Sequence, residues 1–549
     1  MTPQAALAED RPAVAAVRPT DQRRLDETVA RLREAAPGFA RIGIPERIAL
    51  ARSMQAGYLR VAEQMVRAGC AAKGLLPGSP SEAEEWATGP WPVVRHLRLV
   101  AEALASLQRT GNTPIGKIHR TADDRLSVRV FPASAIDGVL FGGITVDVRM
   151  EARIGEAELH GSRAPFYRGQ RHDGRTVLIL GAGNLAGIPA MDLVTKLFNE
   201  GKVCLLKMNP VNAYLGPLME DAFAEAIRRN FVAVVYGGAE EGGYLAQHSG
   251  IDEIHLTGSD ATYETLMWGA AGPERDARKA RGATLLSKPV TAELGNVTPV
   301  LIVPGPYTER ELAFQAEGIA GAVAHNASFN CNAPKMLVTP GAWPRRPDLL
   351  AAIERVLAGV PARRAYYPGA EERWRRLTEG REVVRTVGAA GPGALPWTLL
   401  PGLDATNPRE PAFTTEPFCS ILSETEVGSD DPVEFLERGV DFANNRLWGT
   451  LSAELVVHPS SLKDPAIAQA VERAIARLRY GVVTVNAWSG FAFVYGTPPW
   501  GAYPGSTPAN IRSGTGWVHN TPMLEGIEKA VMRHPLTIMP KPPTFPSHR

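Results

Sequence analysis

Two residues in this sequence have the side chains needed for covalent chemistry on a carbonyl group. Cys331 lies in HNASFNCNAPKMLV (325–338), after a predicted helix and among small polar residues. A thiolate attacks carbonyl carbon readily, and it leaves well when a thioester is hydrolysed. Glu293 is a lone acid in the small apolar segment TAELGNVTP (291–299), which we expect to lie between strands. Partial burial would raise the pKa of Glu293 toward neutrality, which suits a general base.

The remaining cysteines point to no further chemistry. Cys70, Cys204 and Cys419 are expected to be buried small hydrophobic side chains. Four cysteines in 549 residues cannot form a disulfide framework, and none has the spacing of a metal-binding finger. We therefore expect no metal site and a reducing, cytoplasmic setting.

A glycine-rich turn, GAGNLAG (181–187), follows the apolar run TVLILG (176–181). A strand that leads through G-x-G-x-x-A into a helix fits a dinucleotide-binding fingerprint, with pyrophosphate at the helix N-terminus. A tight strand-to-helix turn of small residues explains the pattern equally well. The acid expected about 20 residues later to bind a ribose is also missing, because CLLKM (204–208) occupies that position.

These residues lie in segments where strands and helices alternate. The pattern extends over 176–304 and again over 307–486, and predicts parallel sheets covered on both faces. A Pro/Gly/Arg-rich stretch, 359–412, is expected to form loops and one short helix. Apolar positions at three- and four-residue steps predict helices from 21 to 107, and the two-residue period of 125–132 predicts an exposed strand or hairpin arm.

Composition excludes several classes of protein. Hydrophobic residues make up 44% and charged residues 21%, and 59 Lys and Arg against 58 Asp and Glu give a net charge of +1. A charge balance this even excludes the large basic surface that binding to nucleic acid or to an anionic membrane requires. The N-terminus lacks the apolar run of a signal peptide, and no apolar run is long enough to span a membrane.

Six segments in order resemble the aldehyde dehydrogenase superfamily, over roughly 170–505. In addition to the turn that bears Asn184, the six segments are VCLLKMNP (203–210), IHLTGSDA (254–261), TAELGNVTP (291–299), HNASFNCNAPKMLV (325–338), TTEPFCSIL (414–422) and VVTVNAW (482–488). The resemblance implies an α/β fold with two parallel-sheet α/β domains and a small β oligomerisation arm.

The resemblance also implies a reaction, the oxidation of an aldehyde to a carboxylic acid with NAD or NADP. Cys331 would attack the aldehyde and carry thiohemiacetal and thioester intermediates. The side-chain amide of Asn184 and the backbone N–H of Cys331 would hold the oxyanion, so Asn184 is reinterpreted as an oxyanion donor. Glu293 would activate water, whereas members that transfer the acyl group to coenzyme A can dispense with this base.

By the same resemblance, five residues would bind the cofactor. Lys207 would hydrogen-bond the adenosine ribose, and Gly258 and Ser259 would meet the pyrophosphate at a helix N-terminus. Glu416 would bind the nicotinamide ribose, with Phe418 beside the ring.

Some positions depart from the family pattern. Pro210 stands where NAD-preferring members often carry a ribose-binding Glu, which leaves room for NADP. Tyr263 replaces a common glycine of the phosphate turn, Ser328-Phe329 replaces Gly-Gln, and Cys419-Ser420 replaces Gly-Pro. Aromatic residues are candidates for the walls of an aldehyde tunnel: Phe329, Trp488, Phe491, Phe493 and Trp500.

We expect a loose tail over 1–20, a nucleotide-binding domain over 21–292 with a hairpin arm near 120–150, and a catalytic domain over 293–490. Residues 491–549 would form a tunnel segment and an extended C-terminal arm for oligomerisation. A homodimer or homotetramer acting on a small aldehyde is expected by resemblance. The alternatives are a coenzyme A-acylating dehydrogenase or acyl reductase, and a catalytically silent relative that acts as a binding protein.

Overall fold

The computed structural model describes residues 17–169, 172–388 and 390–548, which form two compact units. The first unit contains residues 17–101 and 172–255, and the second contains 102–169 and 256–548. The predicted loose tail lies mostly outside the described residues. In the described part, none of the helices is long and apolar enough to cross a membrane.

Long helices open the chain, as the apolar spacing predicts. They are α1 (Gln22–Arg41), α2 (Ile44–Lys73), α3 (Pro80–Thr88) and α4 (Pro90–Thr110). Asp21 caps α1 by accepting from the N–H of Arg24, and α2 ends at Gly74, whose φ of 70° is the left-handed conformation of a C-cap. Several buried apolar residues of α1, among them Leu25, Val29 and Leu32, recur at three- and four-residue steps.

The alternating segment of the first unit forms a parallel sheet. In the described part of this unit the strand order is β7-β4-β5-β6, where β4 is Thr176–Leu180, β5 is Val203–Lys207, β6 is Val232–Val235 and β7 is Glu253–Gly258. Pairing of β4 with β5 and of β5 with β6 is parallel, and every residue of β4 and β5 is buried. The connections contain α7 (Ile188–Val194), a π-helical turn η2 (Thr195–Asn199), η3 (Pro210–Leu215), α8 (Gly216–Ala222), α9 (Ala224–Arg228) and α10 (Ala239–Gln247).

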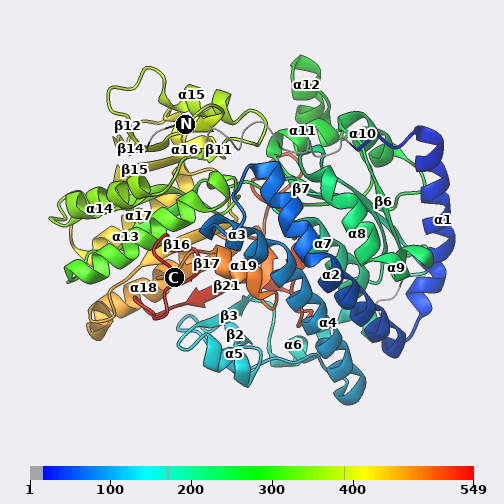
Figure 1. The fold of residues 1–549 in the computed structure, drawn as a ribbon. Coiled ribbons are helices and arrows are strands. Elements are labelled where there is room, and N and C mark those ends of the chain that lie inside the picture. Colours follow the sequence, from blue (N-terminus) through cyan, green and yellow to red (C-terminus); the bar gives the residue numbers. More distant parts are fainter. Residues whose placement is uncertain (1–16, 170–171, 389, 549) are drawn as a thin grey trace. The chain divides into compact units, whose positions relative to one another are not determined.

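A larger sheet organises the second unit (Figure 1). Among the described residues eleven strands have the order β1-β2-β3-β21-β17-β16-β9-β10-β15-β14-β12. The strands from β21 to β14 are parallel, and antiparallel strands flank them on both sides. The bounds are β1 (Ile118–Arg120), β2 (Leu126–Phe131), β3 (Thr145–Met150), β9 (Thr298–Ile302), β10 (Pro334–Thr339), β12 (Arg385–Val387), β14 (Trp397–Leu403), β15 (Ile421–Glu426), β16 (Ser452–Val456), β17 (Val482–Val485) and β21 (Ile527–Arg533).

Helices cover both faces of this sheet, as its apolar strands predict. Side chains alternate along a strand, so Val300 and Ile302 of β9 pack into one core and Leu301 into the other. The first core also takes apolar residues of α13 (Glu309–Ala324) and α14 (Arg346–Gly359). The second takes those of α17 (Pro432–Arg446) and α18 (Pro465–Arg477). The predicted class, α/β with parallel sheets, is confirmed.

Two predictions about the connecting segments are wrong. Residues 359–412 contain, besides the helix α15 (Ala370–Thr378) and the short α16 (Pro411–Thr414), the strands β12 and β14, which extend the main sheet. The tail after residue 496 is not an extended arm, because β21 lies inside the sheet, parallel to β17 and antiparallel to β3. Figure 1 shows β21, in red, near the cyan strands β2 and β3. Whether this region also serves oligomerisation stays a prediction.

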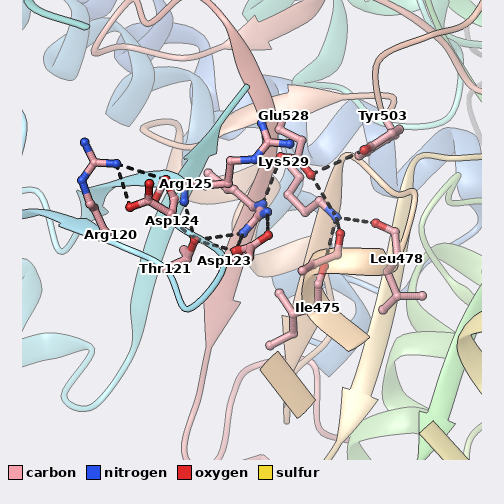
Figure 2. A network of polar contacts seen from close by, with 12 residues as sticks. Arg120, Thr121, Asp123, Asp124, Arg125, Ile475, Leu478, Tyr503, Glu528 and Lys529 are labelled. Carbon is pink, nitrogen blue, oxygen red and sulfur yellow. Dashed lines mark hydrogen bonds and ion pairs between the residues drawn. The ribbon is translucent and has the colours of Figure 1, made fainter. Parts of the chain in front are cut away.

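A buried polar network fixes β21 in place (Figure 2). Lys529, which has 0% exposure, donates to the carbonyl oxygens of Ile475 and Ala476 at 3.0 Å and to that of Leu478. These carbonyls belong to the end of α18, where helical carbonyls lack intrahelical partners. On the same strand, Glu528 accepts from Nε of Arg149 on β3 at 3.0 Å.

The remaining elements of the second unit are short. They are α5 (Ala135–Leu140), α6 (Glu156–Ser162), η1 (Pro165–Arg168), α11 (Asp260–Trp268), α12 (Pro273–Arg281), β8 (Val290–Leu294), η4 (His325–Ser328), β11 (Arg363–Arg364), β13 (Ala394–Leu395), η5 (Ser461–Lys463), α19 (Gly490–Tyr495), β18 (Pro499–Gly501), β19 (Gly514–Thr515) and β20 (Trp517–His519). Over the predicted hairpin arm, β2 pairs with β3, and α5 interrupts their connection. The prediction of an exposed strand is wrong for β2, which is buried between β1 and β3, in the second unit.

Candidate active site

Cys331 lies in the turn between η4 and β10, after the helix α13. Thr308 and Glu311 form a capping box that begins α13, and the helix ends where His325 leaves helical geometry. Cys331 is half-buried, whereas Cys70, Cys204 and Cys419 are buried. Cys331 is therefore the least buried of the four cysteines, and Cys70, Cys204 and Cys419 are buried as expected.

The backbone before Cys331 is strained. Asn326, Ala327 and Ser328 have φ values of 52°, 54° and 66°, a left-handed conformation that costs a non-glycine residue roughly 1–2 kcal/mol. Hydrogen bonds hold this turn in place. The amide Nδ2 of Asn326 donates to the carbonyl of Phe329 at 3.0 Å, and the hydroxyl of Tyr366 donates to Oδ1 of Asn326 at 2.9 Å.

The structure brings Glu293 to the cysteine. The thiol Sγ of Cys331 donates to Oε1 of Glu293 over 3.2 Å, and Glu293 has 3% exposure. Glu293 lies within the strand β8, which corrects the prediction that its segment lies between strands. β8 pairs with β19, where Gly514 faces Glu293; a Cβ on Gly514 would lie 1.8 Å from the carbonyl oxygen of Ala292. Only glycine allows this close pairing beside Glu293.

The surroundings of Cys331 keep its thiol protonated. Burial raises the pKa of Cys331 well above its usual value, and the carboxylates of Glu293 and Glu416 raise it further. Lys335 acts in the opposite direction. The nucleophile consequently needs a proton acceptor, and Glu293 is in hydrogen-bonding contact with the thiol.

Glu416 lies in the turn between α16 and β15, in close contact with Gly295 and Asn296. Its Oε1 accepts from the backbone N–H of Asn296 at 3.3 Å, and a Cβ on Gly295 would lie 1.9 Å from Oε2. Burial raises the pKa of Glu416 to about 7, with Lys335 opposing the shift. The missing side chain at Gly295 is therefore what makes room for a half-buried carboxylate.

Phe418 follows Glu416 in the same turn, with a left-handed φ of 39°. Arg373 on α15 holds this turn, because its guanidinium donates to the carbonyls of Pro417 and Phe418 at 2.9 and 3.1 Å. The ring of Phe418 lies 5.7 Å from that of Phe329.

The predicted tunnel residues lie in different surroundings. Phe329 has 1% exposure and packs at 4.9 Å from Tyr366, between the centroids of the rings. Trp488 is half-buried, and its indole N–H donates to the carbonyl of Asn332, next to Cys331, at 2.8 Å. Phe491 lies 6.1 Å from Trp488.

Trp500 lies on β18 with 1% exposure. Phe493 packs against it at 5.4 Å, with the two rings perpendicular. The role of all these aromatic residues as tunnel walls stays a prediction.

Gly258 and Ser259 lie where β7 ends and α11 begins, as the resemblance implies. Ser259 caps α11, accepting from the N–H of Thr262 at 3.1 Å. Tyr263, at the position of a common family glycine, has 2% exposure and faces into the core. Burial raises the pKa of Tyr263 to about 12.

Asn184 and Lys207 belong to the first unit. Asn184 lies in the turn after β4, and its carbonyl accepts from Nζ of Lys73 at 3.3 Å; Lys73 also forms a buried ion pair with Glu85 at 2.7 Å. Lys207 ends β5, and burial lowers its pKa, an effect that Glu241 opposes. Their roles toward oxyanion and cofactor stay predictions.

Sequence reasoning missed three residues that support the turns around Cys331 and Glu416. They are Lys335, Tyr366 and Arg373. Lys335 could have been noticed, because a lysine inside the apolar run PKMLV (334–338) must be buried when the run forms a central strand. Tyr366 and Arg373 lie in the segment that was expected to form loops.

No family model matches the sequence, and no curated protein matches it in sequence. Solved structures do resemble it in fold. The aldehyde dehydrogenase KauB from Pseudomonas aeruginosa superposes with a TM-score of 0.63 at 18% identity, over 94% of this chain and 90% of that one. An NADP-dependent glyceraldehyde-3-phosphate dehydrogenase from Bacillus halodurans, complexed with NADP, gives 0.62 at 17% identity over 93% and 91%.

A third structure is a mutant of aldehyde dehydrogenase C from Pseudomonas syringae, complexed with NAD+ and octanal. It gives a TM-score of 0.61 at 16% identity, over 92% of this chain and 88% of that one. The chain therefore has the fold of aldehyde dehydrogenases over more than nine tenths of its length. This confirms the fold that the six sequence segments imply.

Proposed function

We propose that this protein oxidises an aldehyde to a carboxylic acid, with NAD+ or NADP+ as the hydride acceptor. The observation that carries the proposal is the contact of 3.2 Å between the thiol of Cys331 and the carboxylate of Glu293, within an aldehyde dehydrogenase fold. Two structures of similar fold, one crystallised with NADP and one with NAD+, support the choice of cofactor.

The reaction begins when the thiol proton of Cys331 moves toward Glu293. The thiolate forms a bond with the aldehyde carbon, and the carbonyl oxygen becomes an oxyanion. By resemblance, the amide of Asn184 and the N–H of Cys331 stabilise this charge. Loss of hydride from the adduct leaves a thioester on Sγ. Glu293 releases the thiol proton to solvent and then takes a proton from water, whose oxygen attacks the thioester. The acid leaves, and the proton on Glu293 returns to the sulfur of Cys331.

The cofactor, when bound, accepts the hydride. Glu416 fits a role in holding the cofactor, because the missing Cβ of Gly295 leaves room for its carboxylate near the Cys331 turn. The pKa of Glu416 is about 7, so at mildly basic pH the carboxylate is ionised and accepts hydrogen bonds from ribose hydroxyls. Phe418 in the same turn would lie beside the nicotinamide ring. Lys207 and Ser259 would bind the adenosine ribose and the pyrophosphate. Pro210, three residues after Lys207, leaves the 2′-phosphate of NADP unopposed by an acid.

Formation of the reduced nicotinamide cofactor can be followed by its near-UV absorbance, with aliphatic and aromatic aldehydes each offered with NAD+ and with NADP+. Cys331→Ala is expected to abolish turnover, since no other side chain replaces the nucleophile. Glu293→Gln is expected to release about one equivalent of reduced cofactor, more slowly than wild type because the thiol proton must then pass to solvent. Very slow turnover should follow, because the thioester accumulates. A steady rate without that burst would contradict the role of Glu293.

Glu293 also favours water over coenzyme A as the acyl acceptor. A base buried in contact with the nucleophile is what hydrolysis needs and what acyl transfer to a thiol can omit. The same contact argues against a silent binding protein, which has no need of it. Added coenzyme A should leave the rate of aldehyde oxidation unchanged.

We further propose that the protein is a homo-oligomer that uses the hairpin region. The helix α5, between β2 and β3, exposes Ile136, Val139 and Leu140 by 70%, 83% and 69%. Three large apolar side chains so exposed on one short helix are typical of an interface. A homodimer or homotetramer covering this patch agrees with the expectation from the resemblance.

A further inference from the structure

Lys335 is buried next to the cysteine that the proposed reaction uses. It is the second residue of β10, four residues after Cys331, and has 1% exposure. A lysine is almost never buried in this way without partners, because removing an ammonium from water is costly. Its partners should therefore show what its charge does.

The first partner is the strained turn. Nζ of Lys335 donates to the carbonyl of Ser328 at 3.1 Å, and Ser328 is the last of the three left-handed residues that precede Cys331. The same ammonium lies 5.8 Å from the centre of the Phe418 ring. Lys335 thus connects the turn that carries the nucleophile with the turn that carries Glu416.

The second set of partners is ionisable. Burial lowers the pKa of Lys335, and the guanidinium of Arg373 on α15 lowers it further; the carboxylate of Glu416 and the thiols of Cys419 and Cys331 oppose this and favour the charged ammonium. Glu293, on β8, faces the Cys331 thiol as well. At Cys331 the positive charge of Lys335 lowers the pKa of the thiol, against the carboxylates of Glu293 and Glu416, which raise it.

We propose that Lys335 is a positioning residue whose ammonium fixes the Ser328 turn and supplies the positive charge that makes the Cys331 thiolate attainable. The inference rests on the proposed function for its relevance to catalysis. Its physical content, a thiol made more acidic by a buried lysine, can be tested without aldehyde or cofactor.

The test is the rate of Cys331 alkylation by iodoacetamide in the full-length protein between pH 7 and 10, measured by mass spectrometry of the Cys331 peptide. Cys331→Ala provides the background, and the other three cysteines are buried. In Lys335→Met the rate near neutral pH should fall roughly tenfold, which corresponds to a rise of about one unit in the apparent thiol pKa. Lys335→Arg, which keeps the charge and a donor, should stay within about threefold of wild type.

A lysine with a merely structural role predicts a different result. It would lower the melting temperature of Lys335→Met and leave the pH dependence of labelling unchanged, and this outcome would overturn the proposal. Equal slowing by Lys335→Arg and Lys335→Met would overturn it too, because charge would then be irrelevant.

A second variant keeps the proposal testable if Lys335→Met does not fold. Glu416→Gln removes a carboxylate that opposes Lys335 at the thiol, so labelling at pH 8.5, above the pKa of Glu416, should rise about threefold or more. An unchanged rate would contradict the charge balance described above. Absence of aldehyde turnover by the wild-type protein, with labelling rates as expected in the variants, would count against the proposed function and leave this inference intact.

Discussion

Gly295→Ala tests the role of Glu416 through a single methyl group. The new Cβ would lie 1.9 Å from Oε2 and 2.6 Å from Cδ of Glu416, whereas ordinary contacts begin near 3.4 Å. The carboxylate must therefore move by about 1.5 Å (3.4 − 1.9), and the hydrogen bond of 3.3 Å from the N–H of Asn296 breaks. A hydrogen bond made by a charged group contributes ~1.5–3 kcal/mol. If the displaced Glu416 loses one such hydrogen bond to the cofactor, the affinity of the protein for the cofactor should fall by roughly 10- to 150-fold.

The assay is a titration of the purified variant with NAD+ and NADP+, followed by protein fluorescence. Gly359→Ala is the matched control, because a Cβ there meets nothing within 4 Å. It should bind like wild type. The double variant Gly295→Ala with Glu416→Gln should be no worse than either single variant, since both remove the same interaction. Wild-type affinity in a folded Gly295→Ala variant would refute the assignment of Glu416.

Three other variants probe stability and assembly. Burial raises the pKa of Glu454 from 4.5 to about 8. Between these pH values the folded state holds a proton that the unfolded state has lost, so stability falls as pH rises through them. Glu454→Gln should therefore have a larger free energy of unfolding in urea than wild type at pH 8 but not at pH 4. Lys73→Met leaves Glu85 buried without its ammonium and should cost about 3–5 kcal/mol, whereas a melting temperature within a degree of wild type would contradict the importance of this pair. Val139→Asp should reduce the mass found by light scattering, with Leu462→Asp, another exposed apolar side chain, as the control; an unchanged mass would exclude this helix from the interface.

The strands that the sequence predicts correctly are those with unbroken apolar runs. TVLIL (176–180) and VCLLK (203–207) are buried along their whole length, so their composition alone indicates a strand covered on both faces. β21 was missed because its sequence, IEKAVMR, looks like a solvated surface. Its charges are satisfied by an arginine on β3 and by the end of α18, which no local pattern reveals.

At the site, side-chain chemistry was predictable and backbone geometry was not. Cys331 and Glu293 were chosen by residue type and resemblance, and the structure places them in contact. The left-handed turn at 326–328 contains no glycine, and of its three residues only Asn326 is of a type that often adopts a positive φ. Tyr366, which holds that turn, comes from a segment whose proline and arginine content suggested loops.

The position of β21 also constrains the order in which the second unit can fold. β3 pairs with β21, and in this pairing Met150 lies opposite Ile527. During synthesis β3 therefore cannot complete its pairing until the ribosome has added another 377 residues (527 − 150). Closing so long a loop adds little to the equilibrium cost, which grows only with the logarithm of length, but such distant contacts form slowly. Until β21 arrives, β3 and β17 both present open edges, which can pair with other chains. Nascent molecules of this protein should therefore depend on chaperones up to the moment when β21 inserts and closes the sheet.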